Sequence, residues 1–336
     1  MRALVIDGPR SASVREVAVP VPGPGQVVVD VHRVGICGTD LELFTEELAY
    51  FAQGKSRFPL IPGHEWCGVV SAVGAGAGAA AAWLGERVTG DTMLGCGRCR
   101  RCAAGRHHVC ADRNEIGIMG WPGALAEKVL VPAVSLYRLP DTVDDRAGAL
   151  VEPGGNAQRA AAAAGAGPGT TVLVCGPGTI GLLAAAFARA AGAEVHVLGL
   201  DSRREDLAGR FGASRYWTLD APPDRGYDAV IDCTGDEAMP ALALRFVEPA
   251  GRMVYIGVAG KPSAIDSRDL VFGDITAVGI LGASAGLAAA IEHYADGRVD
   301  PGPLVDVVVG LDRAAGALDG RLGTGQGTKV HVDPRL

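Results

Sequence analysis

A glycine motif between an apolar stretch and an alanine-rich stretch sets the strongest limit on how this chain folds. The sequence GPGTTVLVCGPGTIGLLAAAFARAAGAEVHVLG predicts a buried strand over 172–175, then a tight turn and a helix. Gly176, Gly178 and Gly181 form G-x-G-x-x-G in that turn. The first glycine permits the turn, the second lets the backbone approach a pyrophosphate, and the third lets the helix pack closely on the strand. With 49 glycines in the chain the motif alone is weak evidence, but the strand before it and the helix after it predict a dinucleotide-binding βαβ unit.

The rest of the sequence divides into two patterns. Up to Glu152, short alternating apolar stretches such as QVVVDVHRVGI, punctuated by proline and glycine, predict a β-rich domain. After it, apolar strands alternate with alanine-rich helices, which predicts a doubly wound parallel sheet. The tail is predicted to form a helix, loops and a last strand that returns to the first domain. We therefore predict an α/β chain with one domain of residues 1–152 and 283–336, a second domain of residues 153–282, and a catalytic cleft between them.

Four of the eight cysteines crowd into the stretch CGRCRRCAAGRHHVC. Their spacing, C-x2-C-x2-C-x7-C, fits a closed tetrahedral site in which zinc holds an irregular loop together. The arginines between them offset part of the negative charge of four thiolates, and we expect His107 and His108 to be exposed loop residues rather than ligands. The alternatives are a disulfide pair or a thiol cluster without a metal. The four cysteines are Cys96, Cys99, Cys102 and Cys110.

A second group of metal-type residues is spread over the first half of the chain. One cysteine, one histidine and carboxylates from distant segments suit an open zinc site that keeps a position for water or substrate. Any chain of this length contains such residues, so the group gains weight only together with the cysteine loop and the glycine motif. The residues are Cys37, Thr39, Asp40 and Glu42 in VGICGTDLELF, His64 and Glu65 in FPLIPGHEWCGVV, and Glu152 in ALVEPGGN.

Taken together, these motifs resemble the zinc-dependent medium-chain dehydrogenase/reductase family, which includes alcohol, sorbitol, threonine and glucose dehydrogenases. The resemblance runs from the N-terminus to near the C-terminus. It implies a GroES-like catalytic domain, a Rossmann cofactor domain and reversible oxidation of an alcohol by hydride transfer to NAD(P). The matching stretches are CGTD at 37–40, GHE at 63–65, the four cysteines, the pair Glu152–Pro153 and GPGTIG at 176–181.

The resemblance implies two zinc ions and a role for each residue around the catalytic one. Cys37, His64 and Glu152 would bind the catalytic zinc, and the four cysteines would bind a structural zinc. Glu65 is expected beside the catalytic zinc, where it holds the water on the metal or replaces it at some stage. Asp40 is expected to accept the other ring N–H of His64 and so to fix the tautomer of the imidazole.

Two residues that follow Cys37 are given roles by the same resemblance. Thr39 would pass the proton of the substrate hydroxyl outward by hydrogen bonding, while zinc lowers the pKa of that hydroxyl. Glu42 stands where many relatives have a histidine that continues the relay, and the glucose dehydrogenase branch has glutamate there. Because a carboxylate accepts hydrogen bonds from vicinal hydroxyls, Glu42 favours a polyol, sugar or cyclitol as substrate. A solvent-facing position at a helix start fits Glu42 equally well.

The choice between NAD and NADP depends on the end of the second strand of the βαβ unit. Counting back from RFGAS, which resembles a family element, puts the usual acidic position at Gly199 rather than Asp201. A glycine leaves room, and Arg203 and Arg204 suit a 2′-phosphate, so we expect NADP. A small register shift would give Asp201 the acidic role and favour NAD, and the arginines could equally be solvated. The predicted cofactor residues are Gly176, Gly178, Thr179, Ile180, Gly181, Gly199, Asp201, Arg203, Arg204 and Thr234.

Charge and composition exclude several classes of partner. The net charge is −7 and the pI is about 5.5, with both signs interspersed, so no nucleic acid partner is expected. The chain has no run of about 18 apolar residues, so no membrane span is expected. The start, MRALVIDGPR, lacks a signal-peptide pattern, which predicts a cytoplasmic protein with reduced thiols. With 5% aromatic residues, a small polar alcohol is favoured over a large apolar substrate.

Two other functions stay open on the sequence alone. One is a zinc-free quinone or enoyl reductase of the same superfamily. The presence of Cys37, His64, Glu152 and the four-cysteine loop argues against this class, which binds no zinc. The other is a zinc-binding sensor that keeps the fold without turnover, which an intact ligand set argues against. The resemblance also implies a homodimer or homotetramer, with an exposed edge strand of the cofactor domain as the usual seam.

Overall fold

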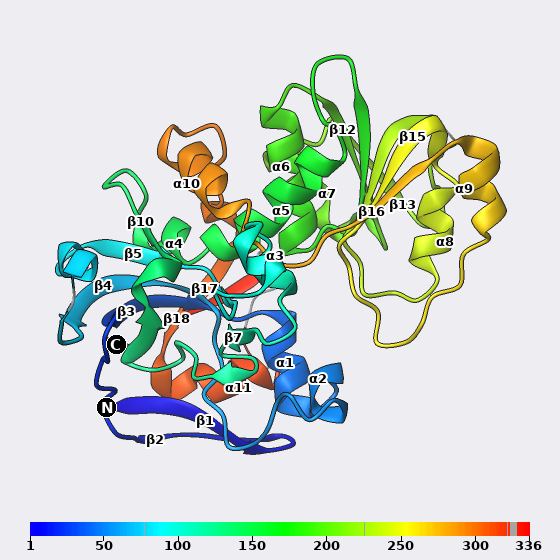
Figure 1. Ribbon diagram of the computed structural model, residues 1–336. Helices are drawn as coiled ribbons and strands as arrows, with labels where there is room; N and C mark the ends of the chain where they lie inside the picture. Colours follow the sequence, from blue (N-terminus) through cyan, green and yellow to red (C-terminus); the bar gives the residue numbers. More distant parts are fainter. Residues whose placement is uncertain (77, 225, 321, 323–327) are drawn as a thin grey trace. The chain divides into compact units, whose positions relative to one another are not determined.

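The structure of the protein is a computed structural model, which describes residues 1–76, 78–224, 226–320, 322 and 328–336 (Figure 1). Contacts between Cα atoms divide the chain into two compact units. Unit 1 consists of Met1–Glu152, Tyr294–Asp296 and Leu304–Leu336, and unit 2 consists of Pro153–His293 and Gly297–Pro303.

Unit 1 is built around a sheet of seven strands among the described residues. Its order is β10-β5-β4-β3-β18-β17, and β9 also pairs with β3. Only β17 and β18 pair in parallel in this sheet. Strands β1 and β2 pair with each other, and β6, β7 and β8 form a small third sheet. The strands are β1 (Arg2–Gly8), β2 (Ser11–Glu16), β3 (Gln26–Gly35), β4 (Glu65–Val73), β5 (Arg87–Gly90), β6 (Met93–Leu94), β7 (Asn114–Ile116), β8 (Gly120–Trp121), β9 (Lys128–Pro132), β10 (Leu136–Arg138), β17 (Val305–Gly310) and β18 (Lys329–Asp333).

Strand β3 explains why these residues form a sheet. Its valines Val27, Val29 and Val31 are at most 1% exposed and belong to the main hydrophobic core of unit 1. Branched side chains of this kind pack well on a pleated, buried surface. The predicted return of the last strand is confirmed, because β18 pairs antiparallel with β3 and sets Val332 opposite Val34.

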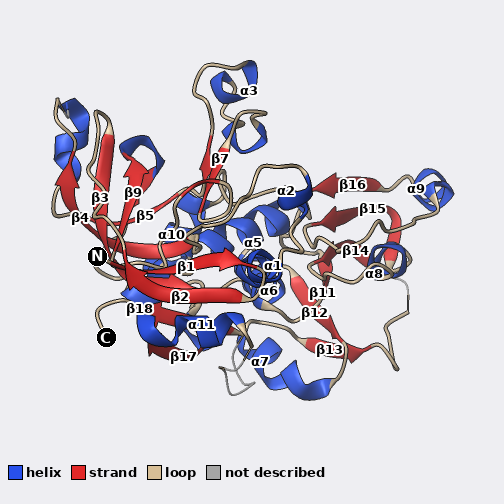
Figure 2. Cartoon of the chain, turned by 90° about the horizontal axis from the view of Figure 1, so that it is seen from below, coloured by secondary structure: helices blue, strands red, loops and turns tan. Residues whose placement is uncertain are grey.

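The helices of unit 1 are short, and several lie in connections. The loop that carries α3 extends away from the strands of unit 1 (Figure 2). The alanine-rich stretch between β4 and β5 contains one 3-10 helix, and Ala77 of that stretch lies outside the described residues. The helices are α1 (Gly38–Thr45), α2 (Ala49–Ala52), α3 (Arg100–Ala103), α4 (Asp145–Gly148), α11 (Ala314–Leu318) and the 3-10 helices η1 (Gly78–Trp83), η2 (His107–Val109), η3 (Ala133–Ser135) and η6 (Leu311–Arg313).

Unit 2 is a doubly wound parallel sheet. Its order is β13-β12-β11-β14-β15-β16, and all neighbouring strands pair in parallel. Successive strands are added on one side of β11 up to β13 and then on its other side from β14 onward. Helices α6 and α7 cover one face and α8 and α9 the other (Figure 1). This is the arrangement of a Rossmann fold, so the predicted fold class is confirmed. The strands are β11 (Thr171–Cys175), β12 (Glu194–Gly199), β13 (Arg215–Thr218), β14 (Tyr227–Asp232), β15 (Val247–Tyr255) and β16 (Thr276–Gly279).

The helices of unit 2 include the one that the glycine motif predicts. α6 begins at Thr179, directly after the motif, and runs to Ala190. Among the helices that the structure describes, none has the length and apolar composition that a bilayer span requires. The others are α5 (Val151–Ala163), α7 (Glu205–Arg210), α8 (Met239–Leu244), α9 (Ser267–Gly273), α10 (Leu287–Ala295), η4 (Ser202–Arg204) and η5 (Gly302–Leu304).

The two units and the predicted domains differ at the second boundary. Unit 1 ends its first segment at Glu152, but residues 283–293 and 297–303 group with unit 2 rather than with the first domain. The physical reason is packing of α10, because the ring of His293 lies edge-on to Phe187 of α6 at 5.3 Å. The assignment of the units as catalytic and cofactor domains, with a cleft between them, stays a prediction.

Candidate active site

Two groups of metal-type side chains lie in unit 1. The first consists of Cys37, His64 and Glu65, which we name the Cys37 cluster. The second is the four-cysteine lobe, made of Cys96, Cys99, Cys102 and Cys110. Within each group, the sulfur, nitrogen or carboxylate oxygen atoms that bind metals all lie within 4.8 Å of one another. Both groups therefore have the spacing that a single shared ion requires.

The Cys37 cluster is assembled by neighbouring strands of the main sheet. Cys37 follows the end of β3 and is the N-cap of α1, whereas Glu65 is the first residue of β4. These strands pair antiparallel and set Gly35 opposite Glu65, which brings the two chain segments together. His64 is 4% exposed and Glu65 1% exposed, and Cys37 is half-buried.

Asp40 fixes both segments of the cluster. Its carboxylate is fully buried and accepts the backbone N–H of Cys37 at 2.9 Å and that of Gly63 at 3.2 Å. An acidic side chain at the third helical position that returns to the N-cap in this way satisfies an otherwise free helix N–H. The carboxylate lies 3.6 Å from Nδ1 of His64, which is longer than a hydrogen bond. Asp40 thus orients the ring through the backbone of Gly63 more than through the predicted direct bond.

The electrostatic surroundings of His64 favour positive charge. Burial alone disfavours an imidazolium, but the carboxylate of Asp40 and the thiol of Cys37 outweigh it and raise the pKa of His64 well above its usual range. Nδ1 of His64 and Oε2 of Glu65 are buried without a hydrogen-bond partner. A sulfur, an imidazole nitrogen and a carboxylate oxygen are ligands that zinc prefers, and a divalent cation would supply the positive charge. The residues present therefore fit zinc.

Lys329 is a member of this site that the sequence reasoning missed. It is the first residue of β18, 4% exposed, and its Nζ lies 2.5 Å from Oε1 of Glu65. The same ammonium donates to the carbonyl of Ile36 at 3.0 Å. Burial disfavours its charge, but Glu65 and Cys37 outweigh burial and raise the pKa of Lys329. The signal in the sequence was a lysine at the start of an otherwise apolar last strand, TKVHV.

The remaining predicted catalytic residues are less closely gathered. Thr39 is half-buried and Glu42 is exposed, and both lie on α1, three residues apart and so on one side of the helix. Glu152 lies in the first turn of α5 and is 8% exposed. Its carboxylate is outside the set of mutually close ligand atoms that the described residues form at Cys37. The assignment of Glu152 as a zinc ligand stays a prediction.

The four-cysteine lobe has the dimensions of a closed zinc site. All four thiols are free of disulfide bonds, and Sγ of Cys99 lies 3.7 Å from Sγ of Cys110. Four sulfurs at about 2.3 Å from one zinc are about 3.8 Å apart, and a disulfide would hold them at about 2 Å. Backbone N–H groups of Arg98 and Cys99 lower the pKa of Cys96 to about 6, which favours the thiolate that a metal needs. This lobe therefore fits zinc as well.

The histidines of the lobe differ from the expectation of exposed loop residues. His108 is 9% exposed, and Nε2 of the half-buried His107 lies 2.7 Å from the carboxylate of Asp91. That carboxylate is buried and also accepts the backbone N–H of Met93 at 3.0 Å. His107 thus ties the lobe to the segment that leads into it, a role that loop composition did not indicate.

The glycine motif of unit 2 has the geometry that its sequence predicts. Gly176 has a φ of +94°, which only glycine adopts without strain. A Cβ on Gly178 would meet nothing within 4 Å, so the backbone there is open to a ligand. A Cβ on Gly181 would collide with the carbonyl of Gly176. Thr179 and Ile180 open α6, whose first N–H groups suit the phosphates of a dinucleotide.

A second group of predicted cofactor residues lies at the end of β12. Gly199 is its last residue, and a Cβ there would collide with the hydroxyl of Tyr216. That hydroxyl donates to the carbonyl of Asp201 at 2.9 Å. The carboxylate of Asp201 accepts the backbone N–H of Arg203 at 3.0 Å and its Nε at 2.8 Å, and these bonds lower the pKa of Asp201. Tyr216 was not among the predicted residues, because nothing in its local sequence sets it apart.

Thr234 lies just beyond the end of β14, the strand next to β11. Its hydroxyl and its backbone N–H both donate to Asp232, at 2.7 Å and 2.9 Å. A Cβ on Gly176 would meet the methyl group of Thr234 at 2.9 Å, so this loop and the glycine turn touch. The predicted cofactor residues therefore follow the carboxyl ends of β11, β12 and β14, where parallel sheets bind ligands.

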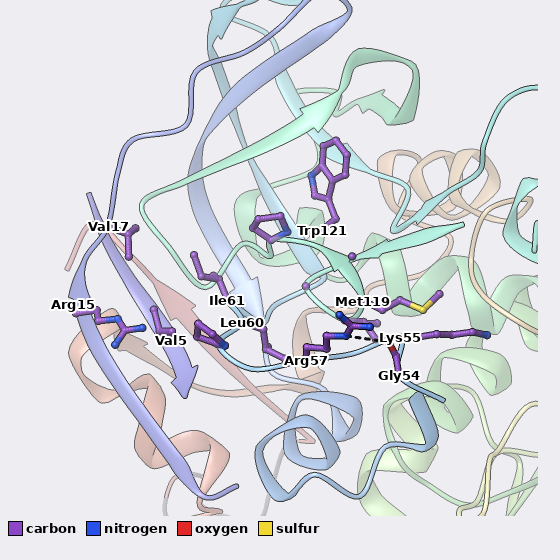
Figure 3. A pocket seen from close by; sticks show the side chains of 15 residues that line it. Val5, Arg15, Val17, Gly54, Lys55, Arg57, Leu60, Ile61, Met119 and Trp121 are labelled. Carbon is purple, nitrogen blue, oxygen red and sulfur yellow. Dashed lines mark hydrogen bonds between the residues drawn. The ribbon is translucent and has the colours of Figure 1, made fainter. Parts of the chain in front are cut away.

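A pocket of about 600 Å³ lies elsewhere in unit 1, between the β1–β2 pair and the segments 54–61 and 117–122 (Figure 3). Its walls are mainly apolar, and Lys55 and Arg57 lie at one end. Arg57 donates to the carbonyl of Gly54 at 3.3 Å. None of the predicted site residues lines this pocket, so it carries none of the predicted chemistry.

Comparison with known proteins agrees with this geometry. Residues 23–141 match the model of the alcohol dehydrogenase GroES-like domain, and residues 179–296 match that of the zinc-binding dehydrogenase. The chain is 32% identical to an L-threonine 3-dehydrogenase of Deinococcus deserti, over 94% of this chain and 93% of that protein. It is 35% identical to an L-threonine 3-dehydrogenase of Anaeromyxobacter dehalogenans, over 80% of this chain and 79% of that protein.

Solved structures give the same result. A protein of Sinorhizobium meliloti described as a zinc-binding dehydrogenase, with NADP bound, has a TM-score of 0.90 and 31% identity, covering 99% of both chains. An alcohol dehydrogenase of Thermus has a TM-score of 0.88 and 28% identity, again over 99% of both chains. The chain belongs to the zinc-dependent medium-chain dehydrogenase/reductase family and is an NAD(P)-dependent alcohol dehydrogenase.

Proposed function

We propose that this alcohol dehydrogenase depends on zinc and reversibly oxidises the secondary alcohol of a small polyhydroxy compound, with NADP as the preferred hydride acceptor. The observation that carries the proposal is the Cys37 cluster, in which three types of zinc ligand lie within 4.8 Å of one another beside a buried network. The residues of the glycine motif bind the cofactor that accepts the hydride in this proposal.

Cys37 and His64 hold the catalytic zinc in this proposal, and Glu152 completes the set as the family resemblance implies. When bound, zinc supplies a Lewis acid that lowers the pKa of the substrate hydroxyl. Asp40 keeps Cys37 and His64 in place through its two backbone hydrogen bonds. The four-cysteine lobe holds a second zinc that braces its loop and takes no part in the reaction.

Thr39 and Glu42 act on the substrate. Thr39 accepts the proton of the reacting hydroxyl in a hydrogen bond and passes it on toward solvent. Glu42, on the same side of α1, accepts hydrogen bonds from neighbouring hydroxyls, because a carboxylate offers two oxygens to vicinal donors. Glu42 is the feature that favours a polyol, sugar or cyclitol.

A β-hydroxy amino acid is the second candidate substrate. Both relatives described above are L-threonine 3-dehydrogenases, and one of them aligns with 94% of this chain. Threonine carries a secondary alcohol, so the same zinc and hydride chemistry applies. The two candidates differ in what lies beside the reacting carbon: hydroxyl groups in one case, an ammonium and a carboxylate in the other.

NADP is favoured over NAD by the groups at the end of β12. Gly199 offers no carboxylate for the ribose hydroxyls, but the room that a glycine was expected to leave there is filled by the hydroxyl of Tyr216. The carboxylate of Asp201 is engaged by the guanidinium of Arg203, whose side chain is 81% exposed, so a 2′-phosphate would compete with Asp201 for this guanidinium. Arg203→Ala should lower the preference for NADP by about tenfold in kcat/KM, the equivalent of about 1.4 kcal/mol. Arg210→Ala, on an exposed arginine of α7, is the control.

A second copy of the chain is the proposed partner. β16 is the edge strand of its sheet, and the neighbouring α9 exposes Val271 and Phe272 at 75% and 85%. An unpaired edge beside exposed apolar side chains suits pairing with an identical copy, which gives a homodimer or a homotetramer. The cytoplasmic location stays a prediction.

A spectrophotometric screen tests the proposal. Polyols, sugars, cyclitols, simple secondary alcohols and L-threonine are each offered with NAD and NADP in parallel, and nicotinamide reduction is followed. A polyhydroxy alcohol oxidised with NADP supports the proposal, whereas oxidation of L-threonine alone selects the second candidate. Reduction of quinones or enones by a zinc-free preparation would show that the protein is a reductase instead. Tightly bound zinc without oxidation of any alcohol would indicate a zinc-binding sensor.

A further inference from the structure

The pair of Glu65 and Lys329 is almost completely removed from water. The two side chains are 1% and 4% exposed, and Nζ lies 2.5 Å from Oε1. The second oxygen of the carboxylate, Oε2, is buried and accepts no hydrogen bond. Gly35 makes room for it, because a Cβ at that position would collide with Oε2.

Stability is a poor explanation for this pair. Removing two charges from water costs several kcal/mol each, and their attraction in the interior often does no more than offset that cost. Replacing such pairs by apolar residues of similar volume is frequently neutral or stabilising. Glu65 also leaves one oxygen unsatisfied, which a purely structural pair would avoid. The pair therefore calls for a reason connected with the site beside it.

That site is the Cys37 cluster. An oxygen of Glu65 lies within 4.8 Å of the sulfur of Cys37 and of a ring nitrogen of His64, so the carboxylate is close enough to share their ion. A small rotation would make Glu65 a protein ligand in the position that a substrate oxygen must take. A catalytic zinc needs that position open, whereas a structural zinc has it filled by protein.

We propose that Lys329 is a positioning residue that holds Glu65 back from the metal, so that the open position stays available to the substrate. The inference rests on the proposed zinc site. The ammonium binds Oε1 and the carbonyl of Ile36 at the same time, so it links Glu65 to the segment directly before Cys37. Removing the lysine frees a buried carboxylate that lies within 4.8 Å of the other proposed ligand atoms.

The fold fixes the lysine in this place. β18 sets His331 opposite Gly35, and the backbone N–H of Ile36 donates to Val330 at 3.0 Å. This pairing brings Lys329 beside Ile36. It also brings the lysine to Glu65, from which it is separated by 264 residues in the sequence. A shift of one residue in the pairing would turn the lysine to the other face of the sheet, so the contact depends on this register.

Cobalt in place of zinc tests the proposal, because its visible absorption reports the number and type of ligands. Wild-type protein, Lys329→Met, Lys329→Arg and the double variant Lys329→Met/Glu65→Gln are loaded with cobalt. Each is titrated with imidazole, a neutral ligand whose binding does not depend directly on the lysine charge. The four-cysteine lobe is closed and should not respond, so the change on titration reports the Cys37 cluster.

The expected results separate the variants. Wild type and K329R bind imidazole with a spectral change, whereas K329M loses the change and retains its metal about tenfold more tightly against a chelator. The double variant regains the imidazole response, because glutamine is a weaker ligand than glutamate. An unaltered imidazole response in folded K329M would overturn the proposal, as would a double variant that stays unresponsive.

Two further outcomes are assigned in advance. If wild type itself gives no imidazole-sensitive cobalt spectrum, the proposed zinc function fails and not only the role of Lys329. Folding is followed by circular dichroism for each variant. If K329M does not fold, Lys329→Gln, which keeps a donor for the carbonyl of Ile36, replaces it with the same expected and opposing results.

Discussion

The Cys37 cluster and the four-cysteine lobe are both compact sets of zinc-type ligands in unit 1, yet they are built in opposite ways. The lobe takes all of its ligands from 15 consecutive residues, 96–110, and supplies four sulfurs. The cluster takes its ligands from the ends of β3 and β4, and its supports from α1 and β18. Four ligands that are close in the sequence can fill all positions of a closed site. An open site needs ligands from distant segments, and the sheet must hold them so that one position on the metal stays free.

The largest effect is expected at Cys37, the proposed thiolate ligand of the catalytic zinc. Cys37→Ser should lower kcat/KM for the alcohol by about 10³-fold, or about 4 kcal/mol, because the Lewis acid loses its thiolate ligand. The midpoint of thermal unfolding should change by less than about 4 °C, since the sheet around the site is intact. Steady-state kinetics and a thermal melt of the same preparation measure both. If Cys37→Ser kept activity near the wild-type level, the Cys37 cluster could not be the catalytic site that distinguishes it from the four-cysteine lobe.

The lobe should give the reverse pattern. Cys99→Ser should lose the structural zinc and about 3 kcal/mol of folding free energy, since metal binding is coupled to folding in such loops. Chemical denaturation measures the loss, and Arg98→Ala, on an exposed arginine of the same loop, is the control. A stable Cys99→Ser protein with a selective loss of turnover would mean that the lobe is the reactive site.

A smaller effect is expected when the support of the cluster is altered. Asp40→Asn replaces one acceptor oxygen by a donor, so it weakens the backbone bonds to Cys37 or Gly63. We expect the metal of the Cys37 cluster to bind 10- to 100-fold more weakly, or about 1.4 to 2.7 kcal/mol, with the lobe metal unchanged. Competition with a chromogenic chelator measures the two affinities, and Asp112→Asn, at an exposed position two residues after the lobe, serves as control. Equal weakening of both metals would argue for a general loss of structure.

The smallest effect is a pH dependence of the tie between the lobe and Asp91. The hydrogen bond to Asp91 raises the pKa of His107 above its usual value. A raised folded pKa gives stability that is fully present below about pH 6.5, the unfolded value, and is lost as pH rises through the folded pKa. Because the side chain of His107 is 34% exposed, the contribution should stay below about 1 kcal/mol.

His107→Gln tests that dependence. Wild type should unfold at a higher temperature than the variant at pH 6, and the difference should shrink toward zero by about pH 9. Melting curves of both proteins across that range give the comparison. A difference that grows with pH would have the wrong sign for a protonated His107 and would assign the tie to the neutral ring.

The contrast between the two sites also explains what the sequence could predict. The four cysteines, and the three glycines of the βαβ turn, lie so close in the chain that spacing alone defines their geometry. Gly176 has a positive φ, the backbone at Gly178 is open, and a Cβ on Gly181 would collide with the carbonyl of Gly176 in the same turn. The predicted return of the last strand to the first domain is likewise confirmed, by the pairing of β18 with β3.

Residues that act across long distances in the chain could not be read in this way. Lys329 reaches Glu65 only through the register of β18 on β3, and Tyr216 reaches Gly199 only because β13 pairs with β12. The second boundary of the compact units differs from the predicted domain boundary because α10 packs on α6, a contact between residues about 100 positions apart. Such contacts are fixed by pairing and packing of distant segments, which composition and spacing do not encode.

The most direct test of the central claim is the zinc content of wild type, Cys37→Ser and Cys99→Ser, measured by elemental analysis on the same samples as alcohol oxidation. The account predicts two zinc ions per wild-type chain and about one in each variant, with kcat/KM lowered about 10³-fold by Cys37→Ser and not by Cys99→Ser in its folded state. A wild-type enzyme that turns over without zinc, or a Cys37→Ser protein that keeps both ions and full activity, would contradict it.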